Sequence, residues 1–261
     1  MWLDEEKAFH KRDLVLSKPF VNAAGVLGFA PDKRRVPAVD KLGAFITHPI
    51  SLRARQPAVN RAYLPFNGGY LVHTGLPNPG INQAIRRFRR SWAAADLPII
   101  VHVLVESPST LVEMVRKLEG LENVQGIELG LPPACAPTEL DAIMAAGAGE
   151  LPVIPCLGPE QVPLLLDTLM DLQPSIVHLV EPRGALPAAG GEIVSGRLYG
   201  PAIFPVMLKA AQVLAAAGLN VIANGGVFAR WQINSLMATG VTAVGLGSVL
   251  WGLDPEESLS L

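Results

Sequence analysis

Short apolar runs alternate with longer amphipathic or alanine-rich runs from Phe20 onward, and glycine or proline closes most of them. This alternation is typical of parallel strands joined by crossover helices. The expected strands, eight in number, span 20–24, 44–48, 99–105, 124–129, 152–156, 175–180, 220–223 and 242–247. Eight strand–helix units in about 250 residues predict a (β/α)₈ TIM barrel of the α/β class. We expect residues 1–261 to form this one domain, and a doubly wound open sheet is the alternative fold.

Two of the expected helices have clear start signals. A serine and a proline precede the run 109–118, and a glycine and a proline precede the run 202–217. The segment 51–79 differs, because it is too long for a simple connection and is rich in proline, asparagine and glycine. Extended loops of this length are usually lids or binding loops. We therefore expect 51–79 to be a loop that forms one wall of a site.

The composition excludes several classes of protein. Half of the residues (50%) are hydrophobic and 17% are charged, which is too apolar for a disordered chain. A formal net charge of -2 gives no field that would attract nucleic acid. The two cysteines do not have the spacing of a disulfide framework or a zinc site, so we expect reduced thiols in a cytoplasmic protein.

Neither a secretory signal nor a membrane span is expected. The N-terminus is charged from Asp4 onward and lacks an apolar core. The stretch 231–253 carries no charge, but polar residues and Gly240 divide it into a helix and a strand. Strands of a buried parallel sheet are this apolar without contact with lipid.

Glycine-rich loops follow the seventh and eighth expected strands, at 223–227 and 245–250. In a TIM barrel these two loops often bind phosphate. Glycine lets backbone N–H groups approach an anion closely, and the dipole of a following helix adds to the attraction. The pattern therefore predicts a phosphate site at these loops.

Several motifs taken together resemble the FMN-dependent dihydroorotate dehydrogenases. They are NAAG at 22–25, GAFITHPIS at 43–51, TGLPNPG at 74–80, SGRLYGPAIFPVML at 195–208, ANGGV at 223–227 and VGLGS at 244–248. The resemblance is collinear over nearly the whole chain. It implies an FMN-binding oxidoreductase of pyrimidine biosynthesis, with the flavin across the mouth of a barrel and a small-molecule substrate beside it.

The resemblance also implies site residues. The flavin phosphate would lie near the two glycine-rich loops, the flavin ring near the end of the first strand, and the substrate against the 74–80 loop. The implied cofactor-binding residues are Ala24, Gly25, Thr47, His48, Gly196, Gly200, Gly225, Gly226, Gly247 and Ser248, and the implied substrate-binding residue is Asn78.

The chain departs from the family at the flavin-contacting lysines. The threonine–lysine pair after the second strand is Thr47 and His48 here. The lysine that ends the fifth strand and supports the reduced flavin is expected to be replaced by Pro155. Loss of a cation from a water-excluded site removes charge stabilisation of several kcal/mol.

The loop that carries the general base of the family also differs, because Gly130 and Pro133 stand at its asparagine and base positions. Proline accepts no proton, and general base catalysis contributes about 10² to 10⁴-fold. Cys135, two residues later, is the only nearby replacement, so Cys135 and His48 are the catalytic candidates. We expect altered or lost dehydrogenase activity.

Two alternatives stay open beside the flavoprotein. One is a non-catalytic barrel scaffold or subunit without flavin, and the other is a barrel enzyme that depends on a metal or a phosphate ligand. Imidazole and carboxylate suit divalent ions, although the spacing here is not diagnostic and no metal is expected in the preferred interpretation. The residues that could supply metal ligands are His48, His102, Glu128, His178 and Glu181.

Two further expectations concern the surface. Arg86, Arg87, Arg89 and Arg90 are expected on a solvated outer helix rather than on a recognition surface. A homodimer is expected, because barrel enzymes often self-associate.

Overall fold

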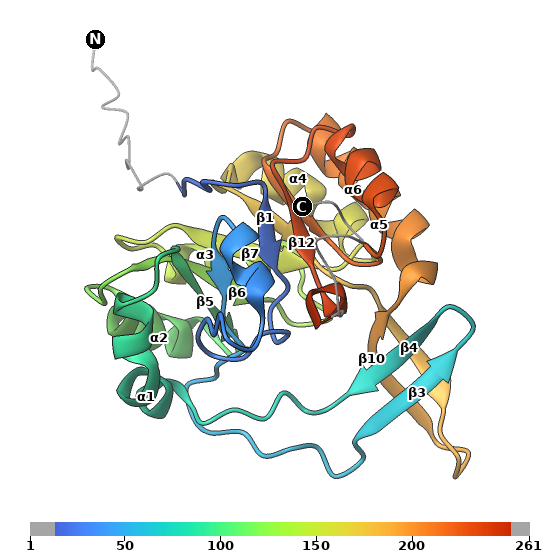
Figure 1. Ribbon diagram of the computed structural model, residues 1–261, viewed down its shortest axis with the longest axis horizontal. Helices are drawn as coiled ribbons and strands as arrows, with labels where there is room; N and C mark the ends of the chain where they lie inside the picture. The colour runs from blue at the N-terminus through green and yellow to red at the C-terminus, as the bar shows by residue number, and fades with distance from the viewer. Residues whose placement is uncertain (1–13, 252–261) are drawn as a thin grey trace.

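An eight-stranded sheet forms the centre of the computed structural model, which describes residues 14–251 (Figure 1). All paired strands of this sheet run parallel. In the order in which they pair, the strands are β1 (Phe20–Asn22), β12 (Ala243–Leu246), β11 (Val221–Asn224), β8 (Val177–Leu179), β7 (Val153–Leu157), β6 (Val124–Gly130), β5 (Ile99–Leu104) and β2 (Phe45–Ile46).

The two end strands of this order also meet. Val21 and Ala44 form a parallel bridge, and the Gly43 N–H donates to the Phe20 carbonyl at 2.7 Å. The sheet therefore closes into a barrel, and all eight expected strands are confirmed. The open doubly wound sheet is excluded.

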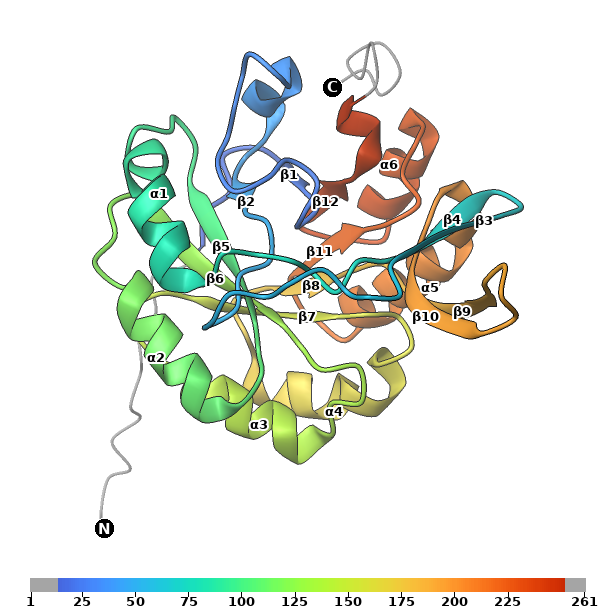
Figure 2. The same cartoon turned by 90° about the horizontal axis from the view of Figure 1, so that it is seen from below.

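Helices surround the barrel (Figure 2). The α-helices are α1 (Ile81–Ala93), α2 (Pro108–Leu118), α3 (Pro137–Ala146), α4 (Val162–Leu172), α5 (Phe204–Ala216) and α6 (Arg230–Met237), and the 3₁₀ helices are η1 (Pro37–Lys41), η2 (Pro201–Ile203) and η3 (Ser248–Trp251). The four arginines of α1 are all exposed, as expected of a solvated outer helix. No helix within residues 14–251 is long and apolar enough to cross a bilayer.

Side-chain alternation divides the core into two layers. The larger cluster fills the space outside the strands. The smaller cluster fills the barrel interior, and its buried members are Val21, Ala44, Ile46, Ile100, Ile154, Ile176, Ile222 and Ala243. The residues two positions further along each strand point into the same interior, nearer to its carboxyl-terminal mouth.

The segment 51–79 is not the plain loop expected from the sequence. It contains the hairpin β3 (Ala62–Phe66) and β4 (Gly69–His73), and β4 pairs with β10 (Ile193–Tyr199), which pairs in turn with β9 (Arg183–Pro187). This antiparallel sheet projects from one side of the barrel (Figures 1 and 2). The first part of the 195–208 motif is therefore a strand.

Candidate functional site

Four polar residues form a layer inside the barrel, above the apolar cluster. His102, Glu128, Cys156 and His178 come from the consecutive strands β5, β6, β7 and β8. Glu128 and His178 are 0% exposed, and His102 is 6% exposed. Since the apolar cluster lies beneath them, these groups must satisfy one another or a ligand from the mouth.

Glu128 is the centre of this layer. Its Oε1 lies 2.5 Å from Nδ1 of His102, and its Oε2 lies 2.7 Å from Nδ1 of His178. Burial acts to raise the pKa of Glu128, but the charge and hydrogen bonds of the two histidines hold that pKa well below its usual range. Glu128 is therefore a carboxylate that accepts one hydrogen bond from the Nδ1–H group of each imidazole.

The same layer contains the donor set of a metal site. One ligand atom each of His102, Glu128 and Cys156 lies within 4.8 Å of the others. Donors that share one tetrahedral zinc ion lie about 3.3 Å apart, given metal–ligand distances of about 2.0 Å. The 2.5 Å contact between His102 and Glu128 is shorter and is that of a hydrogen bond. The geometry favours a hydrogen-bonded cluster over a metal centre.

The interior position at the end of β7 belongs to Cys156. Val153 and Leu157 pack in the outer core and Ile154 packs in the barrel interior, so alternation turns Pro155 outward and Cys156 inward. Pro155, which was expected in the place of the family lysine, therefore faces away from the barrel interior. Burial, followed by the charge of Glu128, raises the pKa of the Cys156 thiol, so the position carries no charge.

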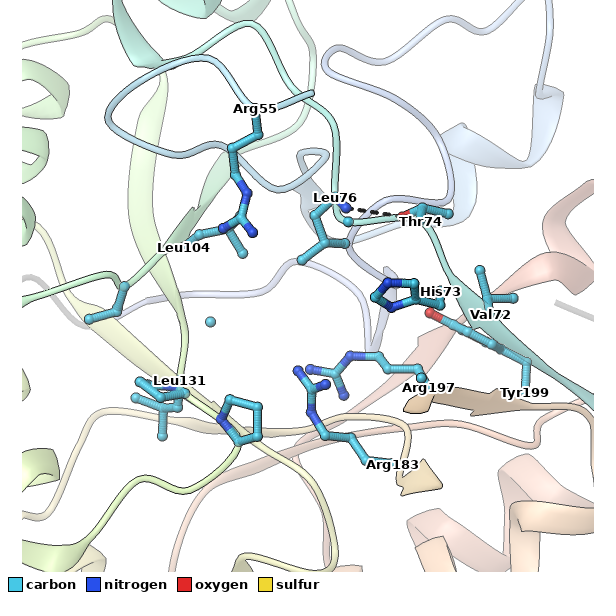
Figure 3. Close-up of a pocket in the computed structure, with 16 residues that line it drawn as sticks. Arg55, Val72, His73, Thr74, Leu76, Leu104, Leu131, Arg183, Arg197 and Tyr199 are labelled. Atoms are coloured by element: carbon cyan, nitrogen blue, oxygen red, sulfur yellow. Dashed lines mark hydrogen bonds between the residues drawn. The ribbon is translucent and has the colours of Figure 1, made fainter. Parts of the chain in front are cut away.

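Above this layer, a cavity of about 320 Å³ opens between the barrel mouth and the antiparallel sheet (Figure 3). We call it the mouth pocket. This volume is within the range of small-molecule sites. The lining includes segment 72–76, segment 130–133 and the side chains of Arg55, Arg183, Arg197, Leu104 and Tyr199.

Positive charge dominates the mouth pocket. Figure 3 shows the guanidinium groups of Arg183 and Arg197 next to each other and Arg55 directed toward the same space from the opposite wall. Arg55 has an ion pair with Glu106 at 3.5 Å. Within residues 14–251, no ion pair joins either of the other two arginines to a carboxylate, although the charge of Glu160 acts on Arg183.

The neighbouring guanidinium group of Arg197 influences the pKa of Arg183. Burial and then the charge of Arg197 lower the pKa of Arg183. Arg197 donates to the backbone carbonyl of Glu181 at 2.6 Å, which fixes its side chain in the mouth. Two guanidinium groups held side by side form a site with a high affinity for a negatively charged group.

The residues expected to hold a flavin phosphate do come together. Gly225 and Gly226 after β11 and Gly247 and Ser248 after β12 line one small pocket, together with Gly200. We call it the glycine pocket. Gly225 and Gly226 have φ values of +106° and +75°, which other residues rarely adopt. The glycine loops thus have the backbone form expected for them.

The side chains of the glycine pocket nevertheless do not fit a phosphate. Glu181 and Tyr199 also line it, and none of its lining residues is cationic. Glu181 is 6% exposed and accepts a hydrogen bond from Asn224 at 3.1 Å. The remaining cavity of about 20 Å³ has room for about one water molecule. A flavin phosphate would meet both a steric barrier and a carboxylate.

Tyr199 is held firmly in this position. Its ring stacks on Tyr70 with centroids 5.6 Å apart, and Tyr70 stacks on Tyr63 at 4.7 Å. Burial raises the pKa of the Tyr199 hydroxyl, with a further contribution from the charge of Glu181. The antiparallel sheet therefore places a neutral aromatic ring between the glycine pocket and the mouth pocket.

The residues expected near a flavin ring lie at the mouth but are partly engaged. The Thr47 hydroxyl accepts from the His102 N–H at 3.0 Å and donates to the His48 carbonyl at 3.1 Å. His48 packs on Phe29 with ring centroids 5.0 Å apart, and burial lowers its pKa. Ala24 packs partly against the interior cluster, next to Gly25.

Two other expected site residues have structural roles instead. The Asn78 side chain accepts from the N–H groups of Ser51 and Gly80 and donates to the Leu76 carbonyl, so it is already occupied within its own loop. A Cβ on Gly196 would lie 2.4 Å from the Val72 carbonyl oxygen, so glycine is required there for strand packing.

Cys135 does not lie at the barrel mouth. It is 1% exposed and belongs to the outer core, just before α3. Burial and then Glu139 raise its pKa to about 11. Proline at 132 and 133 sets the turn that sends this side chain toward the helices, and the expected catalytic role of Cys135 has no support in its position.

Sequence reasoning missed the functional side chains of β9 and β10. Arg183, Arg197 and Tyr199 lie in a segment that was not expected to form strands. The available signal was the presence of two arginines in an otherwise apolar and glycine-rich stretch with few acidic residues. Their convergence depends on the pairing of Arg183 with Arg197 across the two strands.

Comparison with known proteins agrees with this architecture. The family model described as dihydroorotate dehydrogenase matches residues 10–140, half of the chain. A dihydroorotate dehydrogenase B (NAD(+)) catalytic subunit from Trichlorobacter lovleyi is 25% identical, over 90% of this chain and 84% of the relative. The protein of the same name from Latilactobacillus sakei is 29% identical over the same shares. With its closed barrel and glycine loops, the chain belongs to the dihydroorotate dehydrogenase family.

Proposed function

We propose that this protein is a dihydroorotate dehydrogenase relative that binds a small multivalent anion in the mouth pocket and has no resident flavin. The observation that carries the proposal is the arginine pair, Arg183 and Arg197, which has no ion pair to a carboxylate within residues 14–251 and lies in a cavity of small-molecule size. The planar guanidinium group of arginine can donate two parallel hydrogen bonds to one carboxylate or phosphate group. The ligand class is therefore a small di- or tricarboxylate or a phosphorylated compound.

The absence of a resident flavin rests on the glycine pocket. Its cavity of about 20 Å³ and the carboxylate of Glu181 oppose a phosphate. The expected lysine positions hold no lysine either, since His48 and Pro155 stand there and the interior neighbour of Pro155 is Cys156. Dehydrogenation with FMN, as the family resemblance implies, is therefore not part of the proposal.

Freshly purified protein is expected to be colourless above 350 nm. Added FMN should keep its full fluorescence when titrated with the protein. The measurement is an absorbance spectrum followed by a fluorescence titration, with free riboflavin as a control for non-specific quenching. A yellow protein would contradict the proposed loss of the flavin. Saturable quenching of FMN fluorescence by the protein, without the same quenching of riboflavin, would also contradict it.

Binding of multivalent anions is expected in isothermal titration calorimetry. Succinate, sulfate and inorganic phosphate are suitable probes, and glycerol is a neutral control of similar size. Affinity should weaken as sodium chloride is raised, because partly exposed ion pairs are screened by salt. If none of the three anions binds better than glycerol, the proposed function is wrong.

A further inference from the structure

His102 is the only histidine of the buried layer that reaches toward the mouth pocket. It is 6% exposed, whereas Glu128 and His178 are 0% exposed. A Cβ built on Gly130, which lines the mouth pocket, would lie 2.7 Å from Nε2 of His102. The ring edge of His102 thus takes the space that a side chain at 130 would fill.

The two nitrogens of His102 have different surroundings. Nδ1 is committed to Glu128 at 2.5 Å, and the backbone N–H of His102 donates to Thr47. Because the carboxylate accepts, Nδ1 carries a proton, which leaves Nε2 as the ring atom that can exchange a proton with a ligand. A carboxylate that fixes the tautomer and orientation of an imidazole in this way is the arrangement of a general acid–base pair.

We infer that His102 is the proton donor and acceptor for the anion bound in the mouth pocket, with Glu128 as its positioning residue. In the forward step, a proton leaves the ligand for Nε2 and the electron pair stays on the ligand. The new imidazolium faces the carboxylate of Glu128, and the added negative charge of the ligand faces Arg183 and Arg197. The reverse step returns the proton, so no oxidant or other reactant is needed.

This inference rests on the proposed anion binding and names the chemistry of the same pocket. The ligand would be an acid with a labile C–H or O–H bond next to a carboxylate or phosphate. A bound anion near Nε2 also favours its protonation, so binding and proton uptake should be linked. The titratable groups around His102 are Glu128 from β6, Cys156 from β7, His178 from β8 and His48 after β2. The charges of Arg197 from β10 and of Glu181 after β8 act on the same layer through Cys156.

Calorimetry with sulfate tests the linkage, because sulfate does not titrate near neutral pH. In buffers of different ionisation enthalpy at pH 7.5, the wild type is expected to take up a substantial fraction of one proton. His102→Gln should bind sulfate within a few-fold of the wild type with no proton uptake. His73 lines the mouth pocket and is the competing acceptor of a proton, so His73→Gln is compared with His102→Gln and should keep the uptake.

Two outcomes separate this inference from the proposed function. Sulfate binding without proton uptake, or uptake that His73→Gln removes, would overturn the role of His102 and leave anion binding intact. No sulfate binding would overturn both.

A second measurement needs no ligand. Nitrogen-15 NMR of the wild type labelled in its imidazole rings should show His102 protonated at Nδ1 and unprotonated at Nε2 near pH 8. Observation of the opposite tautomer would overturn the inference even if His102→Gln fails to fold.

Discussion

Replacing Glu128 with glutamine is expected to lower the free energy of unfolding by about 3–5 kcal/mol, the cost of breaking a fully buried charged network. The carboxylate accepts from two Nδ1 atoms at 2.5 and 2.7 Å. A carboxamide offers one oxygen and turns an NH₂ group toward the second imidazole. Urea unfolding measures the loss.

The matched control is Glu122→Gln, at an exposed position where a change within about 0.5 kcal/mol is expected. A loss below 1 kcal/mol at Glu128 would mean that the two imidazoles do not depend on its charge. The prediction would then have to be abandoned.

The lowered pKa of Glu128 predicts that the wild type loses folding stability at acid pH. The ordinary pKa of a glutamate is 4.5, and the folded protein holds that of Glu128 below it. Its stabilisation is therefore complete above about pH 4.5 and is lost as the pH falls toward the folded value. The decrease in the free energy of unfolding at acid pH should be smaller in Glu128→Gln, which can be measured by urea unfolding at pH 7, 5 and 3.

The barrel was predictable because each of its strands is an apolar run closed by glycine or proline. The antiparallel sheet was not, since Pro65 and the glycines at 68 and 69 mark the first hairpin as loop. Gly196 and Gly184 weaken the strand pattern of β9 and β10 in the same way. Both strands form because glycine admits close approach, with the Gly196 Cα beside the Val72 carbonyl.

The candidate site was predictable where it depends on backbone form. The glycine loops after β11 and β12 converge as expected, since strand order in a barrel brings them together. What fills the space between them was not predictable. Tyr199 and Glu181 come from segments whose direction is set by long-range pairing, and only the structure shows that they close the glycine pocket.

A similar limit applies to the barrel interior. Sequence reasoning placed Glu128, His102 and His178 at comparable depth as possible metal ligands, together with His48 and Glu181. The structure brings the first three together through hydrogen bonds, whereas Glu181 pairs with Asn224 and His48 packs on Phe29. Cys156 was not singled out, because the face to which each residue of β7 points depends on its register, and a shift of one residue reverses that face.

The second large effect concerns the arginine pair. Arg183→Gln and Arg197→Gln are each expected to weaken succinate binding by about 10- to 100-fold, which corresponds to about 1.5–3 kcal/mol for a hydrogen bond to a charged group. Arg197→Gln should have the larger effect, because its side chain is less exposed and is fixed by the Glu181 carbonyl. Calorimetry at low salt measures both.

The double variant decides whether the two arginines act on one ligand. If they share the same anion, the loss in the double variant should differ from the sum of the single losses, because neighbouring groups that contact one partner are coupled. Arg89→Gln is the control for net charge, since Arg89 is exposed on α1, away from the mouth pocket. It should leave affinity within about two-fold of the wild type. Equal losses in Arg89→Gln and Arg183→Gln would show that binding follows overall charge, and the mouth pocket would then not be the binding site.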